Sequence, residues 1–250
     1  MFSEQSNDTL ACLVKTHPEL ETILQSIIAD NKRTTSMFVH ELRNPLSLLR
    51  GTIQYIETKH PETAEYKYWY QLQDLVNDME QMMAEASLLN TFNTLSKADT
   101  DLIALINSVK NSFMPQAISL QIDLALTIEP GCAPYFSSYS CDALKLKQAL
   151  SNLIKNAFEA TKPGNYIHIS LSKIPGNEQT LSKIAFQIKN NGLPIPEDEL
   201  ENIFTPFVTY KKGGTGVGLA VVKKIADLHY GSISVISKEE FTEFTLLLPL

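Results

Sequence analysis

The sequence predicts a pair of long helices that dimerises as a four-helix bundle, followed by an α+β sandwich. Three observations lead to this fold class. Apolar residues recur at steps of three and four between residues 20 and 90, a break at 57–62 divides that pattern, and helix and strand signals alternate beyond residue 100. Hydrophobic residues make up 44% of the 250 and charged residues 20%, which is the balance of a globular protein.

The first half reads as two amphipathic helices. Their apolar positions, which include Leu42, Leu49 and Ile53 and then Leu72 and Met79, follow a spacing close to a heptad repeat. Pro61 ends the first helix because proline lacks the backbone N–H that a helix needs. A hairpin of this length cannot cover both of its faces, so we expect a homodimer with a four-helix core.

The second half alternates between the two periods. We expect helices over 101–114, 142–161, 196–204 and 217–229, and strands over 120–127, 166–171, 183–189, 232–236 and 244–248. The helices should lie on one face of the sheet. The pattern dissolves over 90–100, which indicates a linker, and the expected parts are an N-terminal segment 1–19, a hairpin 20–95 and a catalytic domain 96–250.

Composition excludes several classes of function. The net charge of −7 argues against nucleic acid as a partner. No stretch approaches the roughly 20 apolar residues that span a bilayer, and the N-terminus lacks the pattern of a signal peptide. The cysteines are scattered, without a metal-binding spacing. We therefore expect a cytoplasmic protein with no membrane span.

The first chemical motif is the string around His40. His40 and Asn44 are four residues apart and share a helix face, with Glu41 beside the histidine. A neutral imidazole is a nitrogen nucleophile near pH 7, and an adjacent carboxylate fixes its tautomer. Pro45 should bend the helix just after the histidine. The alternative is an ordinary histidine on the flank of a coiled coil with a tolerated proline.

The second motif lies in the helix expected over 142–161. Asn152 and Asn156 are four residues apart, opposite an apolar face. An asparagine oxygen suits Mg²⁺, and Lys155 could contact phosphate. The alternative is an amphipathic helix with a polar outer face.

The third motif runs from Asn190 and Gly192 through Phe204 to the glycine-rich stretch 213–218, which opens a helix. Glycines there let backbone amides approach phosphate, and a helix N-terminus favours its charge. A glycine run alone is weak evidence, since linkers use the same residues.

In their order and spacing these strings resemble the sensor histidine kinases of two-component systems over about residues 30–250. HELRNPL resembles the phosphoacceptor box, NLIKNA the N-box, NNGLP the G1 box, and GTGVGLA the G2 box of a Bergerat-type ATP-binding fold. The resemblance implies ATP and Mg²⁺ as cofactors and Asn156 as the Mg²⁺ ligand. It also implies the nucleotide-binding residues Asn152, Lys155, Asn156, Asn190, Gly192, Phe204, Thr209, Lys211, Gly214, Thr215, Gly216, Val217, Gly218 and Leu219.

The same resemblance implies the course of the reaction. His40 is the phosphorylated residue, Glu41 its acid–base partner, and Asn44 a residue that could hold a water for dephosphorylating the partner. Hydrolytic members of the fold carry a glutamate where this chain has Asn152, a poor base, which favours transfer to a side chain over hydrolysis.

The G1 box departs from the family pattern. Asn190 replaces an aspartate that accepts a hydrogen bond from adenine, and Pro194 replaces a glycine. The loss of charge assistance costs on the order of 1 kcal/mol, about fivefold in affinity.

The expected function is therefore an ATP-dependent autokinase that passes the phosphoryl group from His40 to the receiver domain of a response regulator. Residues 1–19 are too short for a sensor domain, so we expect an upstream sensor or signal protein. One alternative is a non-catalytic scaffold or phosphotransfer adaptor with weakened ATP binding. Another is an enzyme that acts mainly as a phosphatase through Asn44.

Overall fold

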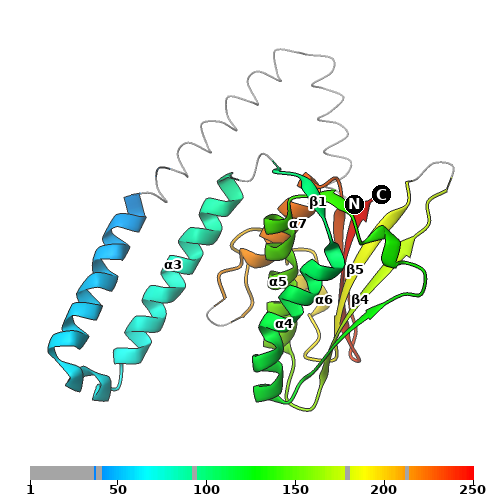
Figure 1. Cartoon of the computed structure of the whole chain (residues 1–250). Helices are drawn as coiled ribbons and strands as arrows, with labels where there is room; N and C mark the ends of the chain where they lie inside the picture. Colours follow the sequence, from blue (N-terminus) through cyan, green and yellow to red (C-terminus); the bar gives the residue numbers. More distant parts are fainter. Residues whose placement is uncertain (1–36, 38–40, 92–94, 178–180, 212–213) are drawn as a thin grey trace. The chain divides into compact units, whose positions relative to one another are not determined.

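The computed structural model describes residue 37 and residues 41–91, 95–177, 181–211 and 214–250 (Figure 1). The chain divides into two compact units, 1–90 and 91–250, which are considered separately. Within the described ranges, no helix is both long enough and apolar enough to cross a membrane.

The first unit contains two helices that contact each other. One helix covers 41–59, a 3₁₀ helix Pro61–Glu65 follows, and α3 covers Trp69–Thr91. Pro61 stands at the start of the 3₁₀ helix, where its missing N–H costs no hydrogen bond. Leu46, Ile53 and Val76 form the buried core, with Trp69 and Met83 packed against it. Arg50 pairs with Glu80, and Trp69 Nε1 donates to Glu57 Oε1 at 3.0 Å.

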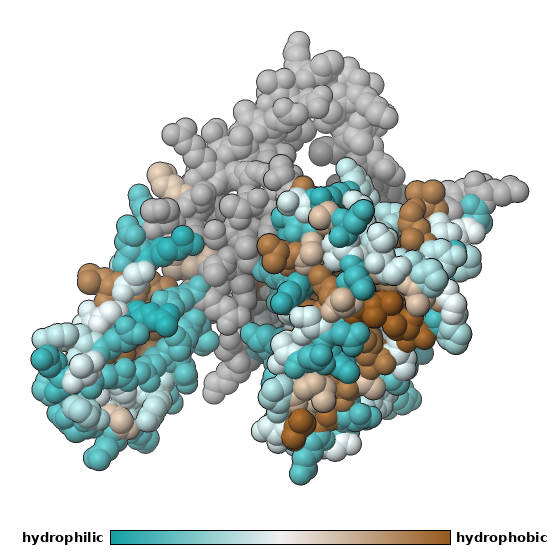
Figure 2. All heavy atoms as spheres, viewed as in Figure 1, coloured by the Kyte–Doolittle hydropathy of each residue, from teal (hydrophilic) through white to brown (hydrophobic). Residues whose placement is uncertain are grey.

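The buried stripe of this unit differs from the expected one. Ile53 is buried as expected, but Leu46 and Val76, which fall outside the expected heptad positions, are buried as well. A single helix pair buries only one stripe per helix, and several of the expected positions are exposed, among them Leu42, Leu49, Leu72, Leu75 and Met79. The face of this unit seen in Figure 2 is mostly hydrophilic, with a few hydrophobic patches. The leucines that are exposed can pack against another protein surface.

The second unit is built on a five-stranded sheet in the order β2-β4-β5-β7-β6. Its strands are β2 Asp123–Ile128, β4 Tyr166–Ile174, β5 Lys183–Asn190, β6 Ser232–Ser237 and β7 Thr242–Pro249. β2 and β4 are parallel and the other neighbours are antiparallel. All five expected strands are present, and their ends differ from the expected ones by at most three residues.

Helices α4, α5 and α7 cover one face of this sheet, as expected (Figure 1). They span Leu102–Leu120, Ala143–Ala160 and Gly218–Leu228, while α6 is a single turn over Glu197–Leu200. The buried side of α5 carries Leu146, Ala149, Leu150, Leu153, Ile154, Ala157 and Phe158. α4 continues past its expected end at 114 because Pro115 is accommodated within the helix.

A second, two-stranded sheet was absent from the sequence prediction. β1 Ala98–Thr100 pairs antiparallel with β3 Tyr139–Cys141, and Ala98 lies opposite Cys141. Tyr139 donates its hydroxyl proton to the Pro249 carbonyl at 2.7 Å, which ties β3 to the end of β7. Burial raises the pKa of Tyr139 to about 12.

One buried histidine makes the stability of the second unit depend on pH. His229, at the end of α7, is 2% exposed, and its Nδ1–H donates to the Ile225 carbonyl at 2.8 Å. Its Nε2 accepts from the Asp142 N–H at 3.1 Å, which requires the neutral ring. Burial holds the pKa of His229 below its ordinary value of 6.5.

We therefore expect acid to destabilise the second unit through His229. The unfolded chain binds a proton on this residue as pH falls below 6.5 while the folded chain does not, so the free energy of unfolding decreases with falling pH. Thermal unfolding followed by circular dichroism at pH 7.5 and pH 5.5 measures the loss. His229→Gln, which cannot titrate, should lose less stability between the two conditions than the wild type. Equal losses of stability in the wild type and in His229→Gln would show that His229 does not cause the pH dependence.

Candidate functional site

Asn190 is a polar residue at the end of an apolar stripe. It follows Ile184, Phe186 and Ile188 at steps of two along β5, so its side chain lies between the sheet and the helices. Asn190 is 2% exposed, and its Nδ2 has no hydrogen-bond partner in the part of the chain that the structure describes. An unpaired buried amide is costly, which makes this position a candidate for contact with a polar ligand.

The turn after β5 approaches the end of α5 closely. The Leu193 N–H donates to the Ala160 carbonyl at 2.9 Å. A Cβ on Gly192 would overlap that same carbonyl oxygen and come within 2.8 Å of Asn190 Nδ2, so only glycine fits here. Gly192 thus keeps the Asn190 amide close to α5. Its predicted place in a binding site is compatible with this geometry.

Asn152 joins α5 to α7. Its Nδ2 donates to the Gly218 carbonyl at 3.1 Å, and Gly218 is the first residue of α7. The first-turn amides of α7, which run from Gly218 through Leu219, lie at a helix N-terminus, where anions are favoured. The described hydrogen bond of Asn152 is therefore structural: it places the start of α7 beside the middle of α5.

One turn further along α5, a cation occupies the predicted metal position. Lys211 Nζ lies 3.3 Å from Asn156 Oδ1 and 2.7 Å from Glu159 Oε2. Asn156 thus presents an oxygen to positive charge, as a Mg²⁺ ligand does. Glu159 was missed by the sequence analysis. Its spacing of three from Asn156 puts both on one helix face, but its partner is 52 residues away, so only the fold reveals it.

Hydrogen bonds join the described residues on either side of 212–213. Thr209 Oγ1 accepts from the Lys211 N–H at 3.2 Å, and the Gly214 N–H donates to the Lys211 carbonyl at 3.1 Å. Gly216 has φ +69°, and a Cβ there would lie 2.6 Å from the Val208 oxygen. Its own carbonyl accepts from the Phe207 N–H at 2.9 Å. Glycine is therefore required at 216 for both its conformation and its space.

The remaining predicted site residues lie around these. Phe204 contacts Phe244 of β7 edge-to-face at 6.4 Å between ring centres. The Val217 N–H lies 3.4 Å from Thr215 Oγ1, and Val217 itself is fully buried before α7. Lys155 is exposed on α5, and no contact of its side chain with the glycine-rich turn is described.

The phosphoacceptor motif lies at the edge of the described residues. His40 lies outside the described residues, and Glu41 and Asn44 are exposed at the start of the helix over 41–59. Pro45 lies inside that helix. The roles predicted for His40, Glu41 and Asn44 stay predictions.

The residues around α5 fit a magnesium–nucleotide. An unpaired buried amide at Asn190 suits a polar base, the start of α7 suits phosphate, and the oxygen of Asn156 already faces a cation. In the described ranges no group of three or more His, Cys, Asp or Glu residues is placed to hold a metal.

Comparison with known proteins identifies this architecture. Residues 141–250 match the family model for histidine kinase-, DNA gyrase B- and HSP90-like ATPases. The sensor histidine kinase ZraS of Escherichia coli K12 is 32% identical over 213 residues, which cover 84% of this chain and 44% of that protein. The chain spans about half the length of the curated relatives it matches, or less.

Two solved structures are also similar. The catalytic domain of the histidine kinase ThkA is 31% identical with a TM-score of 0.54, and the match covers 62% of this chain and 95% of that domain. ThkA in complex with the response regulator protein TrrA is 27% identical with a TM-score of 0.62, covering 87% of this chain and 61% of that one. The chain belongs to the histidine kinase family, and its second unit has the ATPase fold of that family.

Proposed function

We propose that the chain is an ATP-dependent autokinase that phosphorylates His40 and passes the phosphoryl group to a response regulator. The observation that carries the proposal is the convergence of three segments on the second half of α5. Gly218 meets Asn152, Lys211 meets Asn156 and Glu159, and Gly192 meets Ala160. A base-binding amide, a cation ligand and a helix N-terminus are thus gathered along about two turns of one helix.

Each of these groups has one task in the reaction. Asn190 contacts the adenine, Asn156 holds Mg²⁺, and the first turn of α7 binds phosphate. ATP supplies the γ-phosphoryl group, and Mg²⁺ neutralises its charge. Asn156 would hold the metal, and the Lys211 ammonium beside it would contact phosphate oxygens. The chain's own contribution is mainly positioning and charge neutralisation.

The acceptor is the neutral ring of His40. Its unprotonated nitrogen forms a bond to the γ-phosphorus while the bond to the bridging oxygen breaks, and ADP leaves. Glu41, the neighbouring carboxylate, accepts a hydrogen bond from the N–H of the other ring nitrogen. Asn152, which stands where a hydrolytic enzyme needs a base, instead donates its amide to Gly218. That arrangement supports transfer to a side chain over transfer to water.

The first unit supports dimerisation through its exposed leucines. Leu42, Leu49, Leu72 and Leu75 lie outside the core that Leu46 and Val76 form within the chain. A second copy that covers them makes the four-helix bundle expected from the heptad spacing. The hairpin over 20–95 then presents His40 to the regulator, and 96–250 acts as the catalytic domain. The similarity to ThkA, which was solved with a response regulator, supports such a partner. We also propose a cytoplasmic protein that receives its signal from an upstream sensor or signal protein.

The second candidate is a scaffold or phosphotransfer adaptor with weakened ATP binding. Asn190 and Pro194 favour it, since both depart from the family's base-binding loop. The oxygen of Asn156 beside a cation and the helix N-terminus at Gly218 count against it, because both groups that suit a metal and a phosphate are present on one side of α5.

Labelling tests the autokinase directly. Purified protein with γ-labelled ATP and Mg²⁺ should acquire an acid-labile label, because phosphohistidine hydrolyses in acid, and His40→Gln should acquire none. His60→Gln, at a histidine paired with Glu62 on the exposed 3₁₀ turn, serves as the matched control and should label normally. The absence of label in the wild type at every Mg²⁺ concentration would exclude the kinase. Nucleotide binding without label, together with dephosphorylation of the regulator that Asn44→Ala abolishes, would instead support the phosphatase.

Asn190 determines the affinity for adenine. Asn190→Asp restores a charged acceptor at the buried end of β5, so calorimetry should show ATP bound about fivefold more tightly. Asn202→Asp, which adds the same charge at an exposed position, should leave the affinity unchanged. Weaker or unchanged ATP binding in Asn190→Asp would show that the side chain at position 190 does not contact adenine.

Lys211 determines the affinity for the phosphates. Lys211→Met removes a charged donor from the site, so ATP should bind about tenfold more weakly by calorimetry. Lys162→Met removes one exposed charge just beyond α5 and is the control for net charge. Equal weakening in both variants would mean that Lys211 acts only through long-range electrostatics.

A further inference from the structure

The chain enters the second unit through residues 95–97, which we call the entry segment. The entry segment and the strand β1 that follows it contact the rest of the unit at three places. The next residues form β1, which pairs with β3 through Ala98 and Cys141. The Ser96 N–H donates to Asp142 Oδ2 at 3.1 Å, and Lys97 Nζ lies 5.4 Å from the centre of the Tyr230 ring. The chain is thus held by a strand pair, a charged acceptor and an aromatic face within a few residues.

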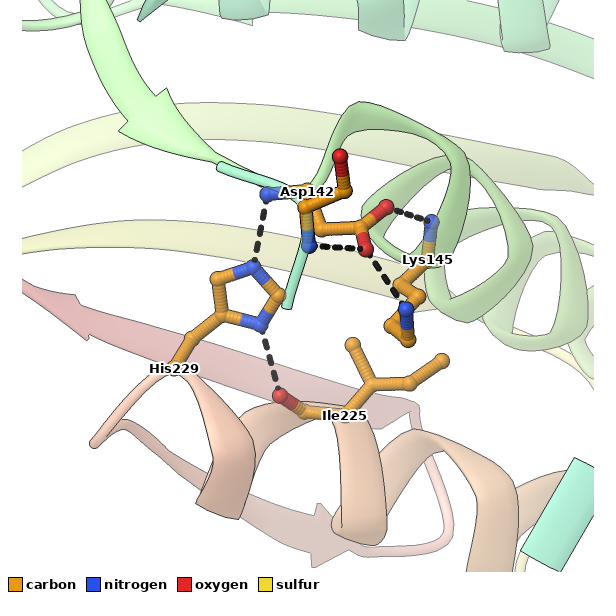
Figure 3. A network of polar contacts seen from close by, with 5 residues as sticks. Asp142, Lys145, Ile225 and His229 are labelled. Carbon is orange, nitrogen blue, oxygen red and sulfur yellow. Dashed lines mark hydrogen bonds and ion pairs between the residues drawn. The ribbon is translucent and has the colours of Figure 1, made fainter. Parts of the chain in front are cut away.

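Asp142 has several bonds at once (Figure 3). Its carboxylate accepts from the Lys145 N–H at 3.2 Å, as the N-cap of α5, and pairs with Lys145 Nζ at 2.6 Å. Burial by itself raises the pKa of Asp142, but the hydrogen bonds from Lys145 and Ser96 outweigh it and leave the pKa below its ordinary value. Its backbone N–H donates to His229 Nε2 at 3.1 Å. One buried residue therefore connects the entry segment, the start of α5 and the end of α7.

The same two helices carry the candidate nucleotide site at their other ends. α5 and α7 are joined at Asn152 and Gly218 beside that site, and at Asp142 and His229 beside the entry segment. Two rigid helices fastened at two points cannot shift independently. A displacement of the start of α7 is therefore transmitted to His229, and from there to Asp142 and Ser96.

Tyr230, whose ring faces Lys97, has an unusual backbone conformation. Its backbone has φ +57°, a left-handed conformation that a large side chain rarely adopts, and its ring is 81% exposed. Glycine or asparagine would satisfy the backbone at lower cost. What the tyrosine adds is an aromatic face under Lys97.

We propose that Asp142 and Tyr230 form a joint that fixes the direction in which the entry segment leaves the nucleotide-binding unit. Both are positioning residues for the phosphoryl transfer to His40, and to this extent the inference rests on the proposed function. The joint holds the entry segment whether or not nucleotide is present. Loosening it releases the entry segment from the nucleotide-binding unit while the nucleotide site itself stays intact.

Limited proteolysis tests the joint without any nucleotide. Trypsin cleaves after Lys97 only when the entry segment detaches, and the fragments are identified by mass. Tyr230→Asn keeps the left-handed backbone and removes the ring, so cleavage after Lys97 should become about fivefold faster. Tyr135→Asn is the matched control, because Tyr135 has Lys173 over its ring at 3.8 Å and lies apart from the entry segment. Unchanged cleavage in Tyr230→Asn, or equal acceleration in both variants, would overturn the joint.

The second arm separates positioning from nucleotide binding. Asp142→Asn keeps a helix cap but loses one acceptor oxygen and the charge that pairs with Lys145. In Asp142→Asn and Tyr230→Asn the rate of His40 labelling should fall about fivefold, while the nucleotide dissociation constant from calorimetry changes less than about twofold. Faster cleavage with unchanged labelling, or a matching loss of nucleotide affinity, would overturn the positioning role. A wild type that never labels would refute the proposed function, and the cleavage rates would still decide whether the joint exists.

Discussion

The packing of α5 against the central sheet is the constraint on which the nucleotide-binding unit depends. The apolar side of α5, from Leu146 to Phe158, is buried against the sheet, so the polar side must face the glycine-rich turn. That orientation brings Asn152, Asn156 and Glu159 onto one accessible surface. The same packing brings Ala160 to Gly192, which leaves no space for a side chain there. The site is thus a consequence of burying one helix face, because its polar residues share a helix with the core.

Periodicity made the main elements of this unit predictable. The strands that became β4, β5 and β7 alternate regularly, and the burial of Asn190 follows from its even spacing after Ile184. β1 and β3 were missed because three residues are too few to show a period. Glu159 was missed because its role depends on Lys211, which only the fold brings near. Local patterns predict the elements, whereas contacts between distant segments require the three-dimensional arrangement.

The helical unit shows a different limit of sequence reasoning. Heptad spacing marks apolar positions but does not say which partner covers each of them. Leu46 and Val76 are covered within the chain, whereas Leu42 and Leu75 are exposed. Leu46 and Val76 were not among the expected heptad positions, so the spacing did not identify the residues that the two helices bury against each other. The exposed apolar positions are the ones that the proposed dimer would cover.

The Lys211 contact and the Asp142 joint differ in how easily their bonds break. Lys211 is an exposed side chain whose ion pair with Glu159 is weak in water, so little free energy is needed to move it away from Asn156. Asp142 and His229 are buried, and their bonds break only if the helices separate. The exposed ion pair therefore lies on the side of the helix pair that carries the candidate nucleotide site, and the buried bonds lie on the side where the chain enters. If the unit transfers a phosphoryl group to His40 as proposed, a firmly held entry segment keeps the same direction from one turnover to the next.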